Sequence, residues 1–299
     1  MRKRGYRAPA SVIHDMPELP EVETIARTLR PQVEGRTINA VHVILPKTLA
    51  AGRELLADLI PGARIDGVRR RGKLLLLDIA SSGASASTHV MAFHLKMTGS
   101  LFVHDLGTEL HPHTRMVFEF APNVDGLGSR LFFDDVRTFG YCRVMRLEDL
   151  PVWPFWAKLG PEPLAIKASE FSKALGRRRG SIKSLLLNQT VIAGIGNIYA
   201  DEACFRSGIH PAASGSRLSE KQRGVLLGNV QDVLLESIEE CGSSIRNYRD
   251  ANGDTGAFQN LFRVYGRAGL SCMECDGRLE KIVIVGRTTV FCPRCQKMP

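Results

Sequence analysis

The stretch that decides how this chain begins its fold is Met16-Pro17-Glu18-Leu19-Pro20-Glu21-Val22-Glu23-Thr24. Apolar residues recur from it at the spacing of a helix with one buried face, at Val22, Ile25, Ala26, Leu29 and Val33. Pro20 suits a first helical turn because its missing N–H is not needed there, and Glu21 and Glu23 favour the positive end of the helix dipole. The stretch therefore predicts the start of an amphipathic helix.

The same stretch is either no more than an acidic helix start or a reactive site. If translation starts at Met16 and the methionine is removed, Pro17 becomes a terminal secondary amine beside Glu18. An unprotonated terminal amine forms Schiff bases with aldehydes or sugar carbons, and its reference pKa is roughly 8. In a chain that begins at Met1, the Pro17 nitrogen is an amide and is not nucleophilic. The reactive interpretation therefore requires initiation at Met16 or removal of the first sixteen residues.

Length and composition restrict the class of protein. The 299 residues, 44% of them hydrophobic, suit two domains or two domains and a small module. No apolar run approaches the roughly 20 residues that span a bilayer. Lys and Arg number 40 against 31 Asp and Glu, a net charge of +9, which favours nucleic acid as a partner before an anionic membrane surface. Residues 1–15 lack the apolar segment of a secretory signal and are interpreted as a basic tail or an upstream start-site artefact.

Short apolar and β-branched runs dominate the chain up to about Arg146, divided by clusters of Gly, Ser, Asn and Asp. They are Thr37–Leu45, Arg64–Val68, Lys73–Ile79, Thr88–Leu95, Arg115–Phe120 and Arg130–Asp134. Several strands at this spacing predict a β-sandwich with the N-terminal helix packed on it. The segment Pro151–Trp156 is expected to lead out of this domain.

Helical periodicity follows, at Ser169–Leu175, Ile182–Leu187, Asn197–Ser207 and Ser219–Ile238. The last of these opens with a capping box formed by Ser219 and Gln222. Between the second and third lies the glycine turn Gly194–Asn197, which is either an ordinary tight turn or a set of free backbone N–H groups facing an anion.

Four of the seven cysteines are paired near the C-terminus. Cys272-x2-Cys275, sixteen residues and Cys292-x2-Cys295 match the spacing of a four-thiolate Zn²⁺ site, with iron or a redox dithiol as alternatives. So short a segment needs a staple to fold. The strand-like Lys281–Phe291 between the knuckles carries Arg287 on a hairpin that the metal would hold rigid. Paired Cys-x-x-Cys units also indicate a reducing compartment, and the lone Cys142, Cys204 and Cys241 are expected to be small buried residues.

Further motifs stand in order between the N-terminal stretch and the cysteines. They are Arg71-Gly72-Lys73, His94-Leu95-Lys96-Met97-Thr98-Gly99, Asp135-Val136-Arg137-Thr138-Phe139-Gly140, Leu159–Leu164, Gly194-Ile195-Gly196-Asn197-Ile198-Tyr199-Ala200-Asp201-Glu202 and Val264-Tyr265-Gly266-Arg267. With Pro17–Thr24 they cover the chain from Met16 to about Lys297. Together they resemble the bacterial formamidopyrimidine-DNA glycosylases, which remove oxidised purines in base-excision repair.

The resemblance implies a role for each residue. Pro17 would attack C1′ of the damaged nucleotide, and Glu18 would act as general acid and base. Glu21 would either orient the site or cap the helix. The residues implied at the reacting nucleotide and its phosphates are the catalytic Pro17, Glu18, Lys73 and Arg287 and the DNA-binding His113, Arg137, Asn197 and Tyr265. On physical grounds alone, Tyr265 is a buried aromatic in a strand.

The nucleotide must leave the base stack before a glycosylase can reach it. The resemblance implies that Met97, Arg137 and Phe139 fill the gap, although composition alone would place Met97 and Phe139 in the core. Tyr248–Gln259 resembles the mobile loop that closes over the lesion, or is an ordinary surface loop. Two residues depart from the family pattern: Lys96 replaces a frequent glycine, and Thr138 replaces a second arginine.

The implied architecture is an α+β multidomain protein. It comprises a basic extension (1–16), a catalytic β-sandwich domain with flanking helices (17–150), a helix-two-turns-helix domain with the lesion loop (151–260) and a zinc-ribbon finger (261–299). The implied partners are one structural Zn²⁺ and double-stranded DNA with oxidised purines or abasic sites. The implied state is a monomer at the nucleoid in the bacterial cytoplasm, without membrane attachment.

Two other functions remain open at this stage. One is an oxidised-pyrimidine glycosylase on the same scaffold, as in the endonuclease VIII branch, whose start and inserted residues differ. The other is a protein that binds lesions or abasic sites, or a zinc-ribbon DNA-binding regulator, without catalysis.

Overall fold

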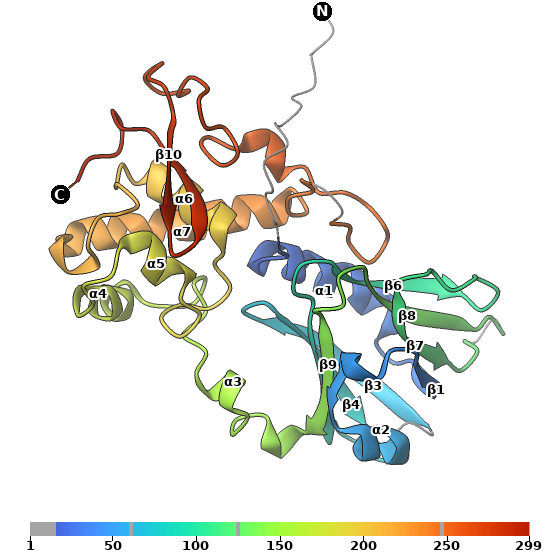
Figure 1. Ribbon diagram of the computed structural model, residues 1–299. Helices are drawn as coiled ribbons and strands as arrows, with labels where there is room; N and C mark the ends of the chain where they lie inside the picture. Colours follow the sequence, from blue (N-terminus) through green and yellow to red (C-terminus); the bar gives the residue numbers. More distant parts are fainter. Residues whose placement is uncertain (1–15, 60–61, 124–125, 246–247, 299) are drawn as a thin grey trace, which may run out of the picture. The chain divides into compact units, whose positions relative to one another are not determined.

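The computed structural model describes residues 16–59, 62–123, 126–245 and 248–298 (Figure 1). The proposed basic extension lies outside these residues, apart from Met16. Within the described residues, no helix has the length and apolar character needed to cross a membrane.

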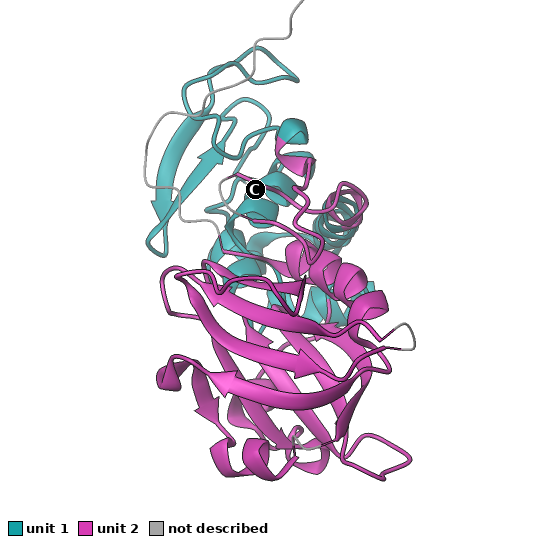
Figure 2. Ribbon diagram, turned by 90° about the vertical axis from the view of Figure 1, so that its right-hand side faces the viewer, with its two compact units in different colours: residues 1–15, 163–234, 260–299 teal, residues 16–162, 235–259 magenta. Residues whose placement is uncertain are grey.

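The described residues divide into two compact units (Figure 2). Residues 16–162 and 235–259 form what we term the strand-rich unit, and residues 163–234 and 260–298 form the helical unit. The α+β prediction is confirmed. The four-part domain division expected from the sequence remains a prediction.

A nine-stranded sheet is the framework of the strand-rich unit, in the order β2-β9-β5-β4-β3-β1-β7-β8-β6. Its strands are β1 (Thr37–Val43), β2 (Leu49–Ala51), β3 (Ala63–Arg71), β4 (Leu74–Ala80), β5 (His89–His94), β6 (Gly99–Asp105), β7 (Thr114–Phe120), β8 (Ser129–Asp135) and β9 (Tyr141–Arg146). The strands expected to form a sandwich therefore belong to one continuous hydrogen-bonded sheet. Only the β2–β9 pair among those described is parallel.

One apolar core holds this sheet to helix α1 (Leu19–Val33), which packs on β3, β4 and β6. Ile25 and Leu29 of α1 are fully buried there. Alternation in β4 directs Leu75 and Leu77 into this core, whereas Leu76 packs on the opposite face with residues of β5 and β9. Both faces of β4 are thus covered, which explains its unbroken run of leucines.

Several short elements of this unit were not predicted. They are β2, β6, β9, α2 (Arg53–Leu59) and α3 (Pro154–Ala157). β6 and β9 mix polar and apolar residues on both faces, so they form strands because they pair with neighbouring strands and not because of a local sequence pattern.

The helical unit contains α4 (Ala168–Gly176), α5 (Ile182–Leu187), α6 (Asn197–Arg206) and most of α7 (Glu220–Glu239). The capping box at the start of α7 is confirmed. The Ser219 N–H donates to Gln222 Oε1 at 2.8 Å, and the Gln222 N–H donates to Ser219 Oγ at 3.2 Å. The Gln189 side chain organises the turn before α6, because it accepts from the Gly194 N–H and donates to the Ile195 carbonyl.

The segment Lys281–Phe291 is a hairpin of β10 (Glu280–Ile284) and β11 (Arg287–Phe291). Its two turn residues, Val285 and Gly286, have φ of 50° and 69°. Two consecutive positive φ values are the mark of a tight hairpin turn that matches the twist of its strands. Arg287 is exposed immediately after this turn.

Candidate functional site

The start of α1 places two carboxylates in the interior of the strand-rich unit. Glu18 and Glu21 are 3% and 2% exposed. Glu21 Oε2 accepts from the Glu18 N–H at 2.9 Å, which caps the helix. Its other oxygen accepts from the N–H and the hydroxyl of Ser243, at 2.8 and 3.2 Å. Glu21 therefore both caps α1 and holds a segment 222 residues away against it.

Two glycines allow close packing in the distant segment that contacts Glu21. Gly242 has φ of +83°, and a Cβ there would lie 3.2 Å from Glu21 Oε1. A Cβ on Gly256 would lie 2.1 Å from the Gly242 carbonyl oxygen. The Tyr248 hydroxyl donates to the Glu21 carbonyl at 3.2 Å. The described part of the predicted lesion loop is thus packed on α1, where the Ala251 N–H also donates to the Thr28 hydroxyl at 3.1 Å, and its mobility remains a prediction.

Lys73 is the second residue of the tight turn between β3 and β4, and it is 8% exposed. Arg70 secures this hairpin, because its guanidinium pairs with Glu23 of α1 at 2.9 Å and with Glu162 at 2.8 Å. Glu162 also accepts from the Gly72 N–H. The Lys73 hairpin is therefore fixed to the helix that carries Glu18.

His94 is buried at the end of β5, close to two lysines. Burial, followed by the charges of Lys96 and Lys73, lowers the pKa of His94 to about 3. Its Nδ1 accepts from the Lys96 N–H at 3.1 Å. His94 is therefore neutral at physiological pH and adds no positive charge next to the ammonium groups of Lys96 and Lys73.

The proposed insertion residues occupy neighbouring turns of the strand-rich unit. Phe139 is 54% exposed, contrary to a core position, and Met97 is half-buried. The Arg137 guanidinium lies 5.0 Å from the centre of the Phe139 ring. His113 lies beside these turns, since its carbonyl accepts from the Asp135 N–H at 2.9 Å.

Asn197 begins α6 in the helical unit and lies against β11. Its Nδ2 donates to the Thr288 carbonyl at 3.2 Å, next to Arg287. The same carbonyl accepts from Lys183 Nζ, also at 3.2 Å. Lys183 in turn pairs with Asp201 at 2.6 Å, and both side chains are fully buried. Asn197 and Arg287 are thus brought together by a network that sequence analysis did not identify.

The Asp201 and Glu202 carboxylates fasten the C-terminal segment to α6. Asp201 Oδ2 accepts from the Val290 N–H at 3.0 Å. Burial raises the pKa of Asp201, and the Lys183 ammonium opposes that shift. Glu202 accepts from three successive N–H groups, those of Arg263, Val264 and Tyr265. Tyr265 is buried, as expected, but it lies in a turn and not in a strand.

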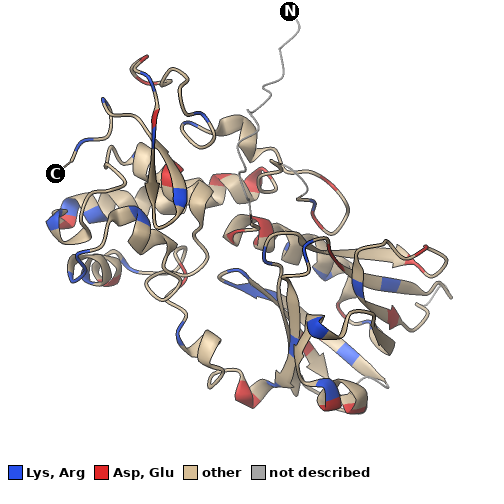
Figure 3. Ribbon diagram, viewed as in Figure 1, with Lys and Arg blue, Asp and Glu red and all other residues tan. Residues whose placement is uncertain are grey.

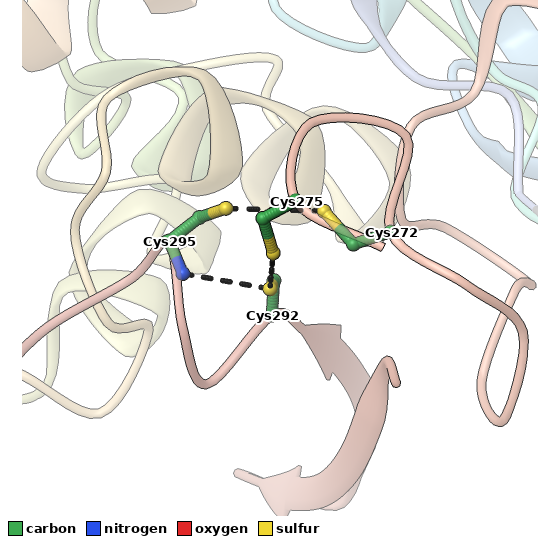
Figure 4. Close-up of side chains that lie close together, drawn as sticks. All are labelled: Cys272, Cys275, Cys292 and Cys295. Carbon is green, nitrogen blue, oxygen red and sulfur yellow. Dashed lines mark hydrogen bonds between the residues drawn. The ribbon is translucent and has the colours of Figure 1, made fainter. Parts of the chain in front are cut away.

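The four paired cysteines converge in the helical unit (Figure 4). Their Sγ atoms all lie within 4.8 Å of one another, with Cys272–Cys295 at 3.9 Å and Cys275–Cys292 at 3.5 Å. Tetrahedral Zn²⁺ with Zn–S bonds of about 2.3 Å would separate its sulfurs by about 3.8 Å. The donor set therefore fits Zn²⁺.

The remaining three cysteines differ in their exposure to solvent. Cys142 and Cys204 are buried, as predicted. Cys241 is exposed, so the prediction for that residue is wrong. It lies in the turn that follows α7, with φ of 57°, and such a turn leaves its side chain outside the buried face of the helix.

The predicted site residues are divided between the two compact units. The strand-rich unit holds Pro17, Glu18, Lys73, His113 and the insertion turns, and the helical unit holds Asn197, Tyr265, Arg287 and the four paired cysteines. Sequence analysis assigned no role to the residues that support them: Thr98, Asp135, Asp201 and Glu202, which it quoted only as motif members, and Lys183 and Ser243, which it did not single out. Lys183 could have been found as a lysine within the apolar helix Ile182–Leu187.

Three family models match the chain in succession. The formamidopyrimidine-DNA glycosylase N-terminal domain matches residues 16–142, its H2TH domain matches residues 159–249, and the zinc finger found in FPG and IleRS matches residues 269–297. Because the last model is a zinc finger and the four thiols fit that ion, the prediction of one structural Zn²⁺ is confirmed.

Curated relatives and solved structures agree with these matches. A formamidopyrimidine-DNA glycosylase of Nitratidesulfovibrio vulgaris is 42% identical over 94% of this chain and all of the relative. One from Chloroflexus aurantiacus is 44% identical over 94% of this chain and 98% of the relative. Two Lactococcus lactis FPG structures, with Fapy-dG DNA and with abasic-site DNA, have TM-scores of 0.85 and 0.84 at 34% and 33% identity. Each alignment covers 94% of this chain, together with 100% of the first Lactococcus lactis chain and 99% of the second.

Proposed function

The chain belongs to the formamidopyrimidine-DNA glycosylase family and is a DNA glycosylase and AP lyase for oxidised purines in base-excision repair, and we propose that its chemistry starts at Pro17. The observation that carries this assignment is the start of the N-terminal family match at residue 16. Initiation at Met16 and removal of the methionine would expose the Pro17 amine at the start of α1.

The Pro17 amine would attack C1′ of the damaged nucleotide as the bond to the base breaks. The base leaves with its bonding electrons and takes up a proton, and the proline nitrogen loses its own proton. The C1′–O4′ bond of the sugar ring then breaks as O4′ is protonated, and the nitrogen and C1′ form an iminium. Loss of a proton from C2′ then expels the 3′ phosphate, and a second elimination expels the 5′ phosphate. Hydrolysis of the iminium frees Pro17 for another turnover.

Glu18 is the group that would move protons in these steps. It directly follows Pro17 and is 3% exposed, and its backbone is fixed by the Glu21 cap. A carboxyl held beside the reacting atoms can protonate the opening sugar and later accept a proton. Glu21 is occupied by Ser243 and the Glu18 N–H, which favours a positioning role for it over proton transfer.

We assign phosphate binding to Lys73, Asn197 and Arg287, and further contacts with DNA to His113, Arg137 and Tyr265. An amide Nδ2 carries two hydrogens, and one of those on Asn197 is directed to Thr288, which leaves the second for a phosphate oxygen. Arg287 is exposed next to it and offers a forked set of donors. Lys and Arg occur along the ribbon of both compact units, consistent with the net positive charge of the chain (Figure 3).

Met97, Arg137 and Phe139 would fill the space of the extruded nucleotide. An aromatic wedge replaces its stacking, and a cation can pair with the orphaned cytosine. The exposure of Phe139 supports this role, because an exposed aromatic on a tight turn is available for insertion. We place the protein, as a monomer, at the nucleoid of the bacterial cytoplasm.

A second substrate class has a specific observation in its favour. One of the matched Lactococcus lactis FPG structures contains oxidised-pyrimidine DNA, at 32% identity and a TM-score of 0.84. Duplexes with 8-oxoguanine and with thymine glycol, supplied together to the protein starting at Pro17, separate the two classes. We expect the oxidised purine to be excised first and Glu18→Gln to abolish that excision. Preferential excision of thymine glycol would overturn the substrate assignment.

A further inference from the structure

We propose that Asp135 is a positioning residue that fastens two neighbouring turns into one rigid wedge. The first, which we term the Met97 turn, is Leu95–Gly99, and the second, the Phe139 turn, is Asp135–Gly140. The inference rests on the proposed function, because these turns carry the residues that would replace the extruded nucleotide.

The carboxylate of Asp135 is 1% exposed and is surrounded by donors from both turns. Oδ1 accepts from the Thr98 hydroxyl and, at 3.2 Å, from the Arg137 N–H. Oδ2 accepts from the Gly140 N–H at 2.6 Å. The two oxygens thus bind the start and the end of the Phe139 turn and, through Thr98, the Met97 turn.

Thr98 is the bridge between the turns. Its hydroxyl donates to Asp135 and accepts from the Arg137 N–H at 2.9 Å. One oxygen atom therefore joins residues 39 positions apart in the chain. Thr98 directly follows Met97, and Arg137 is itself a proposed insertion residue, so the bridge joins the backbone segments that carry the proposed wedge.

The main chain of Asp135 is itself anchored to the sheet. Its N–H donates to the His113 carbonyl at 2.9 Å, and its carbonyl accepts from Arg115 Nε at 2.8 Å. Asp135 also pairs with Gly99 at the end of the β6–β8 ladder. The carboxylate therefore connects the turns to a fixed point of the fold.

Both turns contain a residue that would relax without such restraint. Lys96 and Thr138 have φ of 53° and 57°, a left-handed conformation that is unfavourable for residues with a Cβ, and for β-branched threonine above all. Close packing persists to the end of the second turn, where a Cβ on Gly140 would lie 2.9 Å from Phe133 Cζ. Strained turns of this kind persist only where the surroundings hold them in place.

Rigidity of the Phe139 turn matters because Phe139 is half-exposed, so contacts within its own turn contribute little to holding its ring in place. A loose turn would lose conformational freedom when it enters the base stack, and that loss would oppose insertion. A turn already held in the inserted shape avoids the loss, so the clasp formed by Asp135 and Thr98 should favour extrusion of the nucleotide.

The test uses two matched pairs of variants. Asp135→Asn is compared with Asp134→Asn, the same change one residue earlier on the opposite face of β8. Thr98→Val is compared with Thr98→Ser, which keeps the hydroxyl. A fluorescent base analogue next to 8-oxoguanine reports insertion on binding, independently of catalysis. Single-turnover excision is measured in parallel. We expect Asp135→Asn and Thr98→Val to lose the fluorescence change and at least about tenfold in excision, while Asp134→Asn and Thr98→Ser stay near wild type.

A double variant distinguishes positioning from a general loss of folding. If Asp135 acts through the wedge, Asp135→Asn slows excision by a smaller factor in the Phe139→Ala background than in the wild-type protein. Additive losses, or a wild-type fluorescence change from Asp135→Asn, would overturn the inference. If the wild-type protein itself gave no change on lesion DNA, the proposed function would fail first and the inference with it.

Discussion

Lys96 shows how a single departure from a family pattern can be understood from the backbone. Its φ of 53° lies in the region that glycine enters freely and other residues enter at a cost of about 1 kcal/mol. The conformation of this turn therefore explains why glycine is frequent at this position. The Lys96 ammonium lies 5.6 Å from the centre of the Tyr141 ring, a contact that offsets part of the strain.

We therefore expect Lys96→Gly to raise the free energy of unfolding by about 1 kcal/mol in urea denaturation. Lys96→Ala is the matched control, since it removes the same ammonium but keeps the Cβ. A glycine variant no more stable than the alanine variant would show that the backbone conformation is not the source of the effect.

His94 predicts a specific dependence of stability on pH. Its pKa is lowered from 6.5 to about 3 in the folded protein, first by burial and then by Lys96 and Lys73. Below pH 6.5 the unfolded chain takes up a proton that the folded chain does not. The contribution of His94 to stability is therefore present above pH 6.5 and is lost as the pH falls toward 3, at about 1.4 kcal/mol per pH unit.

Denaturation at pH 7 and pH 5 measures this loss. Relative to His94→Gln, the wild-type protein should lose about 2 kcal/mol more between the two values. Glutamine does not titrate in this range, and its amide oxygen can still accept a hydrogen bond. Equal losses in the two proteins would mean that His94 is protonated, or accessible, in the folded state.

At the scale of elements, long periodic segments were predictable and short paired ones were not. α5 and the start of α7 agree with their sequence patterns because local spacing and capping determine them. β6 and β9 carry no such pattern, since each becomes a strand by pairing with a neighbour distant in sequence. Pro17, Glu18 and the cysteines could be proposed from sequence, whereas the Asp135 clasp and the Lys183–Asp201 pair depend on contacts that only the fold creates.

The zinc finger is the element whose loss should be most visible. Its core is small and includes Cys272 and Cys292 beside Val264, Leu279 and Val290. So few apolar residues cannot hold the β10–β11 hairpin without the metal. Because Asn197 contacts this hairpin next to Arg287, unfolding of the finger would remove both proposed phosphate contacts together.

Cys272→Ser should therefore release Zn²⁺ and weaken binding to abasic-site DNA by more than about tenfold, as followed by a zinc assay and a fluorescence-anisotropy titration. Cys241→Ser, at a thiol outside the cluster, should change neither quantity. Unaltered DNA binding by the zinc-free variant would refute the structural role of the metal.

At the scale of the whole molecule, a segment late in the chain packs against the N-terminal helix. Residues 235–259 belong to the same compact unit as the N-terminal strands, although a helical segment separates them in sequence. Glu21 and Tyr248 make the contact, and the glycines at 242 and 256 allow the close approach. Sequence periodicity cannot reveal a link of this kind, because neither partner carries a local signal for the other.

The central claim is that the Pro17 nitrogen is a free amine in the active protein. Intact mass and N-terminal sequencing of the native protein, followed by borohydride reduction with 8-oxoguanine DNA, test it most directly, since only a Schiff base yields a covalent adduct. We predict a chain that starts at Pro17 and is trapped on the DNA. A chain that starts at Met1, binds the same DNA and is never trapped would contradict the account.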